Sequence, residues 1–313
     1  MPRIEVKSWR ELPPLPPGGV LTIGNFDGVH RGHQEMLRQA RTLADRDGRR
    51  LLAMTFEPSA AALLRPDKAP ELILPSERKF QLLSEYGADD VLVVRTSREF
   101  LDLPPEAFVR EWLVGRIAPA HIVEGPGFFF GHNRAGTIAT LQEMAPACGF
   151  AATQVEQAEL DIPGRGNVRV SSSLIRELIR AGDVAAAATC LTRPYVLYGD
   201  VVDGEKRGRD LGFPTANVDP GAMVVPGDGV YAASVRIGGS EYASAVSIGI
   251  KPTFGGTQRC IEAHLLDAQG DFYRLPIEIT FLQRLRGQQS FADVADLLAQ
   301  IAEDIQRVRQ ILP

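Results

Sequence analysis

The chain is poor in cysteine: it holds three, Cys148, Cys190 and Cys260, far apart along 313 residues. An odd and widely spaced set provides neither a disulfide framework nor the closely spaced ligands of a zinc site. Long hydrophobic runs are lacking too, since no stretch reaches the ~20 apolar residues that cross a bilayer, and the first residues form no apolar secretory segment. We therefore expect a protein of the reducing cytoplasm with no membrane partner.

A surplus of either charge is also absent. Lys and Arg number 34 against 39 Asp and Glu, which gives a net charge of −5 and no basic surplus for binding nucleic acid. The hydrophobic fraction of 44% and the charged fraction of 23% are ordinary for a globular protein. A chain of 313 residues can form two domains, each with its own core, while nothing in the composition indicates an oligomeric state.

Histidine is scarce as well, yet two of the five lie in the segment 24–33, G-N-F-D-G-V-H-R-G-H. An apolar run, Val20 to Ile23, precedes this segment and helical periodicity follows it from Gln34. A strand, a glycine turn and a helix start offer free backbone N–H groups to an anion, and His30 and His33 lie on one side of that helix. Alone, such a histidine is usually a solvated surface residue. H-x-x-H also suits zinc, but no cysteine or acidic cluster accompanies it, so the turn favours polyphosphate.

The rest of the first half alternates buried apolar runs with helical segments. Strands are expected at 51–56, 91–94 and 121–123, and helices from 34, over 77–86 and over 105–116. This alternation predicts a doubly wound parallel sheet. Ligands of such sheets bind beyond the carboxyl ends of the strands, which is where the histidine turn lies.

Two later segments add candidate binding elements. Residues 125–136 form a glycine-punctuated loop with three successive phenylalanines, which either bind a flat heteroaromatic ligand or plug the core under the loop. Residues 170–176, V-S-S-S-L-I-R, place serines at a helix start and Arg176 one turn later. They form either a second phosphate-binding element or an ordinary serine cap with a surface arginine.

From Tyr195 the chain changes to short β-rich runs divided by Gly and Pro, which predicts a small antiparallel barrel. The expected strands are 195–202, 230–237, 242–248, 261–266 and 277–282. A final helix over 291–312 carries an apolar stripe for packing on the barrel, and Ser290 with Asp293 resembles a capping box at its start.

The second half has its own phosphate-type segment. Glycines and basic residues at 204–209 precede L-G-F-P-T-A-N at 211–217. Glycines let a loop fold over phosphates without obstruction by Cβ atoms, although P-T-A-N alone could form only a β-turn. Glu262 stands in a predicted strand, where a glutamate usually faces solvent.

In this order, the histidine segment, the Phe/Gly loop, S-S-S-x-I-R, L-T-R-P-Y at 191–195 and the G-x-x-x-G-R-x-L-G-F-P-T-A-N motif resemble prokaryotic bifunctional riboflavin kinase/FAD synthetases. The resemblance covers nearly the whole chain. It implies an α/β Rossmann-like nucleotidylyltransferase domain over 1–187, then an antiparallel β-barrel riboflavin kinase domain with a C-terminal helix over 188–313. The implied reactions are phosphorylation of riboflavin to FMN and adenylylation of FMN to FAD, with ATP and Mg²⁺.

The resemblance also implies roles for residues. His30, His33, Arg176 and Glu262 are the implied catalytic set, with Glu262 as general base toward the riboflavin 5′-hydroxyl. Thr215 and Asn217 are implied ligands of the Mg²⁺ shell. The implied ATP and phosphate contacts are Gly24, Asn25, Phe26, Asp27, Gly28, Gly32, Ser172, Ser173, Gly204, Gly208, Arg209, Thr215 and Asn217. The implied flavin contacts are Gly127, Phe128, Phe130, Gly131, Tyr231 and Phe254.

Four positions, Ser59, Gly127, Arg274 and Gln288, depart from the pattern of this family. The alternative functions are an enzyme with one surviving activity and a flavin-binding regulatory protein with a degenerate domain. The regulatory alternative predicts the loss of phosphate-handling residues, and these are all present.

Overall fold

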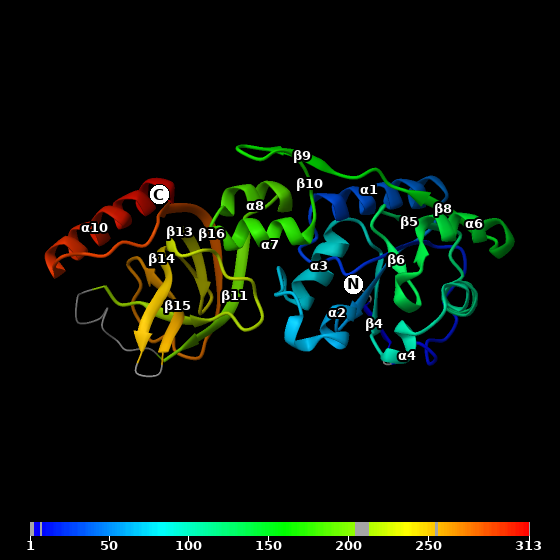
Figure 1. Cartoon of the computed structure of the whole chain (residues 1–313), viewed down its shortest axis with the longest axis horizontal. Coiled ribbons are helices and arrows are strands. Elements are labelled where there is room, and N and C mark those ends of the chain that lie inside the picture. The colour runs from blue at the N-terminus through cyan, green and yellow to red at the C-terminus, as the bar shows by residue number, and fades with distance from the viewer. Residues whose placement is uncertain (1–2, 7, 204–212, 254–255, 313) are drawn as a thin grey trace. The chain divides into compact units, whose positions relative to one another are not determined.

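The computed structural model describes residues 3–6, 8–203, 213–253 and 256–312, which form two compact units (Figure 1). The first comprises Met1–Pro70, Ser76–Asp161 and Arg165–Val170, and the second comprises Glu71–Pro75, Ile162–Gly164 and Ser171–Pro313. Packing therefore changes units at Val170, before the helices α7 (Ser172–Arg180) and α8 (Val184–Leu191). The functional boundary at residues 187 and 188 remains a prediction.

A parallel sheet of six strands forms the first unit, as expected, in the order β1-β4-β3-β2-β5-β8. The strands are β1 (Arg3–Val6), β2 (Val20–Ile23), β3 (Leu51–Glu57), β4 (Asp90–Arg95), β5 (His121–Glu124) and β8 (Ala151–Gln154). Apolar side chains on both faces of β3 explain its continuous hydrophobic run. The strand order reverses between β2 and β5, which is where open α/β sheets bind ligands.

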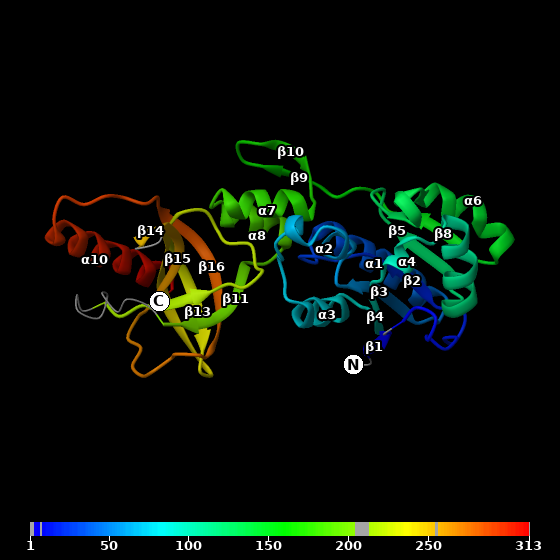
Figure 2. The same ribbon diagram turned by 60° about the horizontal axis from the view of Figure 1, so that its bottom comes forward.

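Helices connect these strands. They are α1 (Arg31–Arg46), α2 (Ala60–Leu64), η1 (Pro66–Lys68), α3 (Ser76–Glu85), α4 (Arg98–Leu101), α5 (Pro105–Ala107), η2 (Phe108–Ile117), η3 (His132–Arg134) and α6 (Ile138–Cys148). The expected helix over 105–116 divides into α5 and the π-helix η2, which buries Trp112 and Leu113. Two small ribbons complete the unit: β6 (Phe129–Phe130) with β7 (Gly136–Thr137), and β9 (Glu159–Ile162) with β10 (Gly166–Arg169), the second visible in Figure 2.

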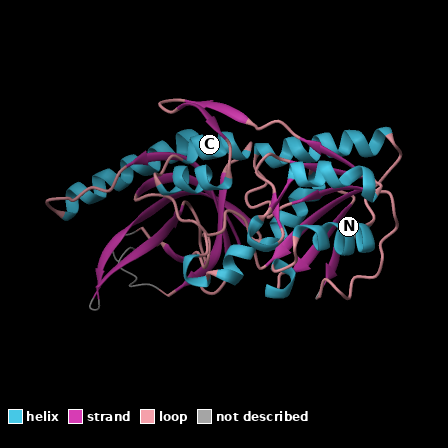
Figure 3. Cartoon of the chain, turned by 45° about the vertical axis from the view of Figure 1, so that its right-hand side comes forward, coloured by secondary structure: helices cyan, strands magenta, loops and turns pink. Residues whose placement is uncertain are grey.

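A closed antiparallel barrel forms the second unit and confirms the predicted architecture; its strands are the long curved magenta arrows of Figure 3. The order around the barrel is β11-β12-β15-β14-β13-β16. The strands are β11 (Tyr195–Val202), β12 (Ala216–Asp219), β13 (Gly229–Ile237), β14 (Ser240–Thr253), β15 (Gly256–Leu265) and β16 (Pro276–Arg286). Sequence reasoning missed β12, which contains the end of the P-T-A-N run.

The terminal helix α10 (Val294–Ile311) starts later than expected, and the predicted capping box is wrong. Asp293 is the N-cap, and its carboxylate accepts the N–H of Asp296 at 2.9 Å, an arrangement as favourable as a serine cap. Val308 packs on the outer face of the barrel, whereas Val294 is 56% exposed. The apolar stripe therefore packs on the barrel through its C-terminal part.

The backbone is strained at Arg274, one of the positions that depart from the family pattern. Arg274, where glycine is common, is exposed and has a left-handed φ of +62°, and its N–H donates to the carbonyl of Val201 at 2.9 Å. A residue with a side chain in this left-handed conformation destabilises the folded state by about 1–2 kcal/mol. Glycine removes that cost, but it stabilises the unfolded state by about 0.4–1 kcal/mol because its chain is more flexible.

Arg274→Gly is therefore expected to stabilise the protein by up to about 1 kcal/mol and to raise Tm by roughly 1–3 °C. Thermal unfolding measures the effect. The matched control is Arg236→Gly, within β13, which should lower Tm because glycine weakens a strand interior. A lower Tm for Arg274→Gly would contradict the assigned strain.

Candidate active sites

The histidine turn begins where β2 ends, and its backbone is strained. Gly24 donates its N–H to the carbonyl of Met54 at 3.0 Å, which holds the start of the turn on β3. Phe26 and Val29 are buried at left-handed φ values of 49° and 38°, beside Gly28 at 84°. Left-handed non-glycine residues are uncommon and are concentrated at functional sites. These left-handed residues mark the turn as a candidate binding loop, and the sequence alone did not reveal them.

The two histidines lie together, as predicted. Their rings stack with centroids 3.7 Å apart, His30 is the N-cap of α1, and Phe26 contacts the ring of His33 edge-on at 5.3 Å. A Cβ at Gly32 would lie 3.2 Å from the His30 ring, so glycine admits the stack. Burial and the neighbouring His30 lower the pKa of His33 well below its usual value. His33 is therefore neutral at pH 7 and can donate one N–H to a phosphate.

A buried carboxyl that sequence reasoning missed lies at the next strand. Glu124, the last residue of β5, is 1% exposed, and burial raises its pKa well above the usual value. Its sequence signal is slight: one acidic residue ends an apolar strand, immediately before the glycine-punctuated loop.

The phenylalanines of that loop differ in burial. Phe130 is buried in the core, 4.9 Å from the Phe108 ring, and Phe128 stacks on it at 5.4 Å. Phe129, which was not predicted as a contact, is 44% exposed, and the Arg134 guanidinium lies 4.5 Å from its ring centroid. The plug interpretation thus holds for Phe130, whereas Phe129 presents an accessible ring.

The two glycines of this loop that were predicted as flavin contacts have different surroundings. Gly131 has a φ of +70°, and a Cβ there would meet the Pro105 backbone at 2.9 Å, so its role is structural. Gly127 is exposed without a left-handed φ, and a Cβ there would meet only the Arg169 guanidinium, at 2.9 Å. Gly127 can therefore accept a side chain.

The serine turn belongs to the second unit. Ser171 is the N-cap of α7, and its Oγ accepts the N–H of Leu174 at 3.2 Å, so Ser172 and Ser173 open the first helical turn. Arg176 is only 9% exposed, and its Nε donates to the carbonyl of Glu71 at 2.6 Å. The serine cap was therefore correctly foreseen, but the surface-arginine interpretation is wrong.

Strand pairing brings together the predicted residues of the barrel. Asn217 on β12 lies directly opposite Glu262 on β15, which in turn lies opposite Ser247 on β14. Directly opposite residues in antiparallel strands present their side chains on the same face. Thr215 immediately precedes β12, and the His264 ring bonds the carbonyl of Pro214 at 2.8 Å. Of the remaining predicted contacts, Gly204, Gly208, Arg209 and Phe254 lie outside the described residues.

Tyr231 occupies a different environment from the one expected of a flavin contact. It is fully buried in the barrel, contacts the Phe281 ring edge-on at 5.3 Å and donates its hydroxyl proton to the carbonyl of Gly227. Because ring and hydroxyl are both engaged inside the core, its placement supports a structural role.

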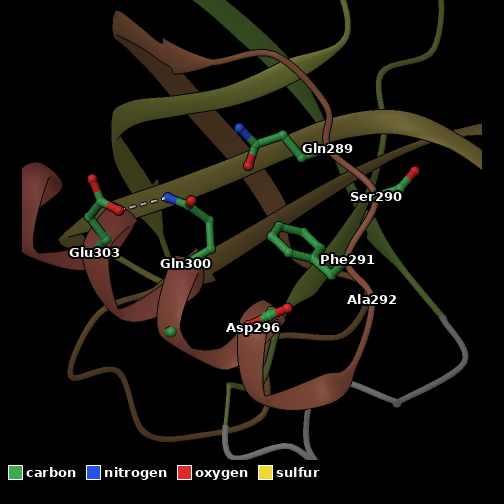
Figure 4. Close-up of a pocket in the computed structure, with 8 residues that line it drawn as sticks. Gln289, Ser290, Phe291, Ala292, Asp296, Gln300 and Glu303 are labelled. Atoms are coloured by element: carbon green, nitrogen blue, oxygen red, sulfur yellow. Dashed lines mark hydrogen bonds between the residues drawn. The ribbon is translucent and has the colours of Figure 1, made fainter.

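A cavity of about 640 Å³, not foreseen from the sequence, opens between the segment after β16 and α10 (Figure 4). Its volume is typical of small-molecule sites. The lining residues are Gln289, Ser290, Phe291, Ala292, Asp296, Ala299, Gln300 and Glu303. Figure 4 shows the Phe291 ring between Gln289 and the first turn of α10.

Gln288 attaches this cavity to the strand opposite Glu262. Its amide donates to the carbonyl of Ile248 at 2.7 Å and lies 3.3 Å from the hydroxyl of Ser247. A Cβ at Gly249 would be 2.6 Å from the same amide, so glycine makes room for it. Gln288 thus has a defined structural role, as does Ser59, the N-cap of α2.

Comparisons with known proteins identify the family. The family model described as FAD synthetase matches residues 13–173, and the one described as riboflavin kinase matches residues 191–312. The bifunctional riboflavin kinase/FMN adenylyltransferase of Escherichia coli K12 is 36% identical over 288 residues, 92% of this chain and 90% of that protein. The chain belongs to the bifunctional riboflavin kinase/FMN adenylyltransferase family. Proteins with the same description from Pseudomonas fluorescens, at 36% identity over 98% of this chain and 97% of that protein, and Bacillus subtilis, at 35% over 92% and 90%, are similarly related.

A solved structure shares the fold of this family member throughout. It is described as a macrolide-efflux protein from Streptococcus pneumoniae and superimposes with a TM-score of 0.87 at 29% identity, covering 99% of both chains. The described part of the present chain contains no helix that is long and apolar enough to cross a membrane. The histidine turn lies within the FAD synthetase match, the pair of Asn217 and Glu262 lies within the riboflavin kinase match, and Arg176 lies between the two matches.

Proposed function

We propose that this protein phosphorylates riboflavin to FMN and adenylylates FMN to FAD, releasing pyrophosphate. The observation that carries the proposal is that each unit brings its own predicted site residues together: the stacked histidines beside the sheet reversal, and Asn217 opposite Glu262 on the barrel. The family matches over residues 13–173 and 191–312 support assigning adenylylation to residues 1–187 and phosphorylation to residues 188–313.

Adenylyl transfer needs alignment and charge stabilisation more than a base. The FMN phosphate, already an anion, attacks the α-phosphorus of ATP, and the bond to pyrophosphate breaks. His30, His33 and the amides at the start of α1 would bind the phosphates as charge shifts toward the leaving group. Gly24 and Gly28 would let the backbone approach, while Asn25 and Asp27 would shape the turn. Ser172, Ser173 and Arg176, which the resemblance implies as pyrophosphate contacts, belong to the second unit, and their role in this step stays a prediction.

Phosphoryl transfer needs a base beside the acceptor. Glu262 would accept the proton of the riboflavin 5′-hydroxyl as its oxygen attacks the γ-phosphorus and ADP leaves. The side-chain oxygens of Thr215 and Asn217 fit Mg²⁺, which prefers oxygen ligands and is commonly completed by phosphate oxygens. When bound, the ion would neutralise phosphate charge.

The cavity beside α10 is a candidate site for the isoalloxazine of riboflavin. It offers the Phe291 ring for stacking, and Gln288 joins its wall to Ser247, which lies opposite Glu262. The acceptor hydroxyl would thereby reach the base from a neighbouring site.

Separate substrate assays with the full chain test the two activities. Riboflavin, ATP and Mg²⁺ should give FMN first and FAD after a lag, while FMN and ATP should give FAD and pyrophosphate without ADP. Chromatography with pyrophosphate detection resolves the products. FMN as the sole product would identify a single-activity enzyme, and flavin binding without turnover would favour the regulatory alternative.

A modest gain of flavin affinity is expected from Gly127→Asn. An amide at this exposed position can hydrogen-bond the polar edge of FMN, and about 1 kcal/mol corresponds to several-fold in affinity. The group that a new side chain would meet is the guanidinium of Arg169, which lies at the end of a flexible side chain and can move aside. The KM for FMN in FAD formation should fall several-fold while riboflavin phosphorylation stays unchanged. Gly127→Ala, with the same Cβ but no amide, is the control, and an equal KM for both variants would exclude the contact.

A further inference from the structure

Glu124 lies where the parallel ladder between β2 and β5 ends. The two strands pair at Val20 with His121 and at Leu21 with Ile122. Beyond these pairs, the N–H of Ile23 donates to the side-chain carboxyl of Glu124. Because the strand order reverses between β2 and β5, this carboxyl lies at the edge where a ligand crevice is expected.

The carboxyl is buried and bonded to backbone. Its described hydrogen bonds come from the N–H groups of Ile23 and of Gly125, and burial raises its pKa well above the usual value. A carboxyl in such a site costs more free energy to bury than an apolar side chain at the end of a strand. The two hydrogen bonds from backbone amides offset that cost.

These two amides begin the two binding segments of the first unit. Ile23 directly precedes the histidine turn, whose first residue, Gly24, is held on the opposite side by the Met54 carbonyl at 3.0 Å. Gly125 is the first residue of the aromatic loop. One side chain therefore fixes the start of both segments, which the proposed function assigns to ATP and to FMN.

We propose that Glu124 is a positioning residue that couples ATP and FMN binding in FAD formation. A ligand that orders one segment through this carboxyl lowers the cost of ordering the other, so each substrate improves the affinity of its partner. Glu124 contacts backbone amides and not the reacting atoms. The inference rests on the proposed adenylylation site.

Initial rates of FAD formation, measured over a grid of ATP and FMN concentrations with the full chain, test the coupling. The rate of FAD formation reports adenylylation alone, so FMN bound at the barrel does not contribute to the measured interaction factor. The parent should show an interaction factor of several-fold, each substrate lowering the apparent dissociation constant of the other. In Glu124→Gln one oxygen becomes an NH₂ group that cannot accept an amide proton, so the factor should approach one while kcat changes less.

The matched control is Thr22→Val, a nearly isosteric change at a fully buried residue of β2, which should leave the interaction factor unchanged. If Glu124→Gln fails to fold, as judged by thermal unfolding, Glu124→Asp retains the carboxyl on a shorter chain and should reduce the factor. A factor of one in the parent, or the parent's factor in a folded Glu124 variant, would overturn the inference alone. Failure of the parent to form FAD would overturn the proposed function as well.

Discussion

Glu262→Gln is expected to lower FMN production from riboflavin by roughly 10²-fold or more, because glutamine cannot accept the hydroxyl proton. The side chain lies on the barrel face that it shares with Asn217 and Ser247, and an amide of the same shape should leave the strands paired. FAD formation from supplied FMN should persist. FMN and ADP production at saturating riboflavin measures the effect.

Another barrel glutamate provides the control. Glu278 on β16 faces Arg236 and is 43% exposed, so Glu278→Gln should leave both activities near the parent values. A Glu262→Gln rate within a few-fold of the parent would exclude Glu262 as the general base.

His33→Ala is expected to lower FAD formation by roughly 10²-fold, the scale on which one charge-stabilising donor contributes to a transition state. Riboflavin phosphorylation should be nearly unchanged, since the histidine turn belongs to the first unit. Pyrophosphate release with FMN and ATP measures the loss. Arg176→Ala should cause a similar loss, with kinase turnover as the check that α7, which Arg176 joins to Glu71, still packs.

The control for His33 is His121→Ala. This part-buried histidine is the first residue of β5, so it lies at the amino ends of the parallel strands, whereas the histidine turn lies at their carboxyl ends. Its ring is hydrogen-bonded to the Thr153 hydroxyl at 2.8 Å. It should leave FAD formation near the parent rate. Equal loss of both activities in His33→Ala would indicate a folding defect instead of a lost contact.

Local patterns carried most of the fold. The strands at 51–56 and 195–202 were predicted correctly because burial and alternation of side chains appear in the pattern of neighbouring residues. The strand β12 was missed because its four residues include Asn and Asp, poor strand formers, and they become a strand only by pairing with β11 and β15. The helix cap at Asp293 was misplaced because Ser290 is an equally good cap by sequence.

In the candidate sites too, some features could be predicted from neighbouring residues and others could not. The H-x-x-H spacing predicted that two imidazoles meet, and they stack. The burial of Tyr231, the amide bonds of Glu124 and the cavity beside α10 depend on segments far apart in the chain. No local pattern could reveal them, since each is a product of tertiary packing.

Mixing two variants that each lack one activity tests the central claim, that one chain carries two independent sites. Glu262→Gln and His33→Ala, each incubated alone with riboflavin, ATP and Mg²⁺, should form almost no FAD. Their mixture should form FAD readily, because His33→Ala supplies FMN that Glu262→Gln adenylylates. A mixture that forms no more FAD than the two variants separately would contradict the account and indicate one shared site.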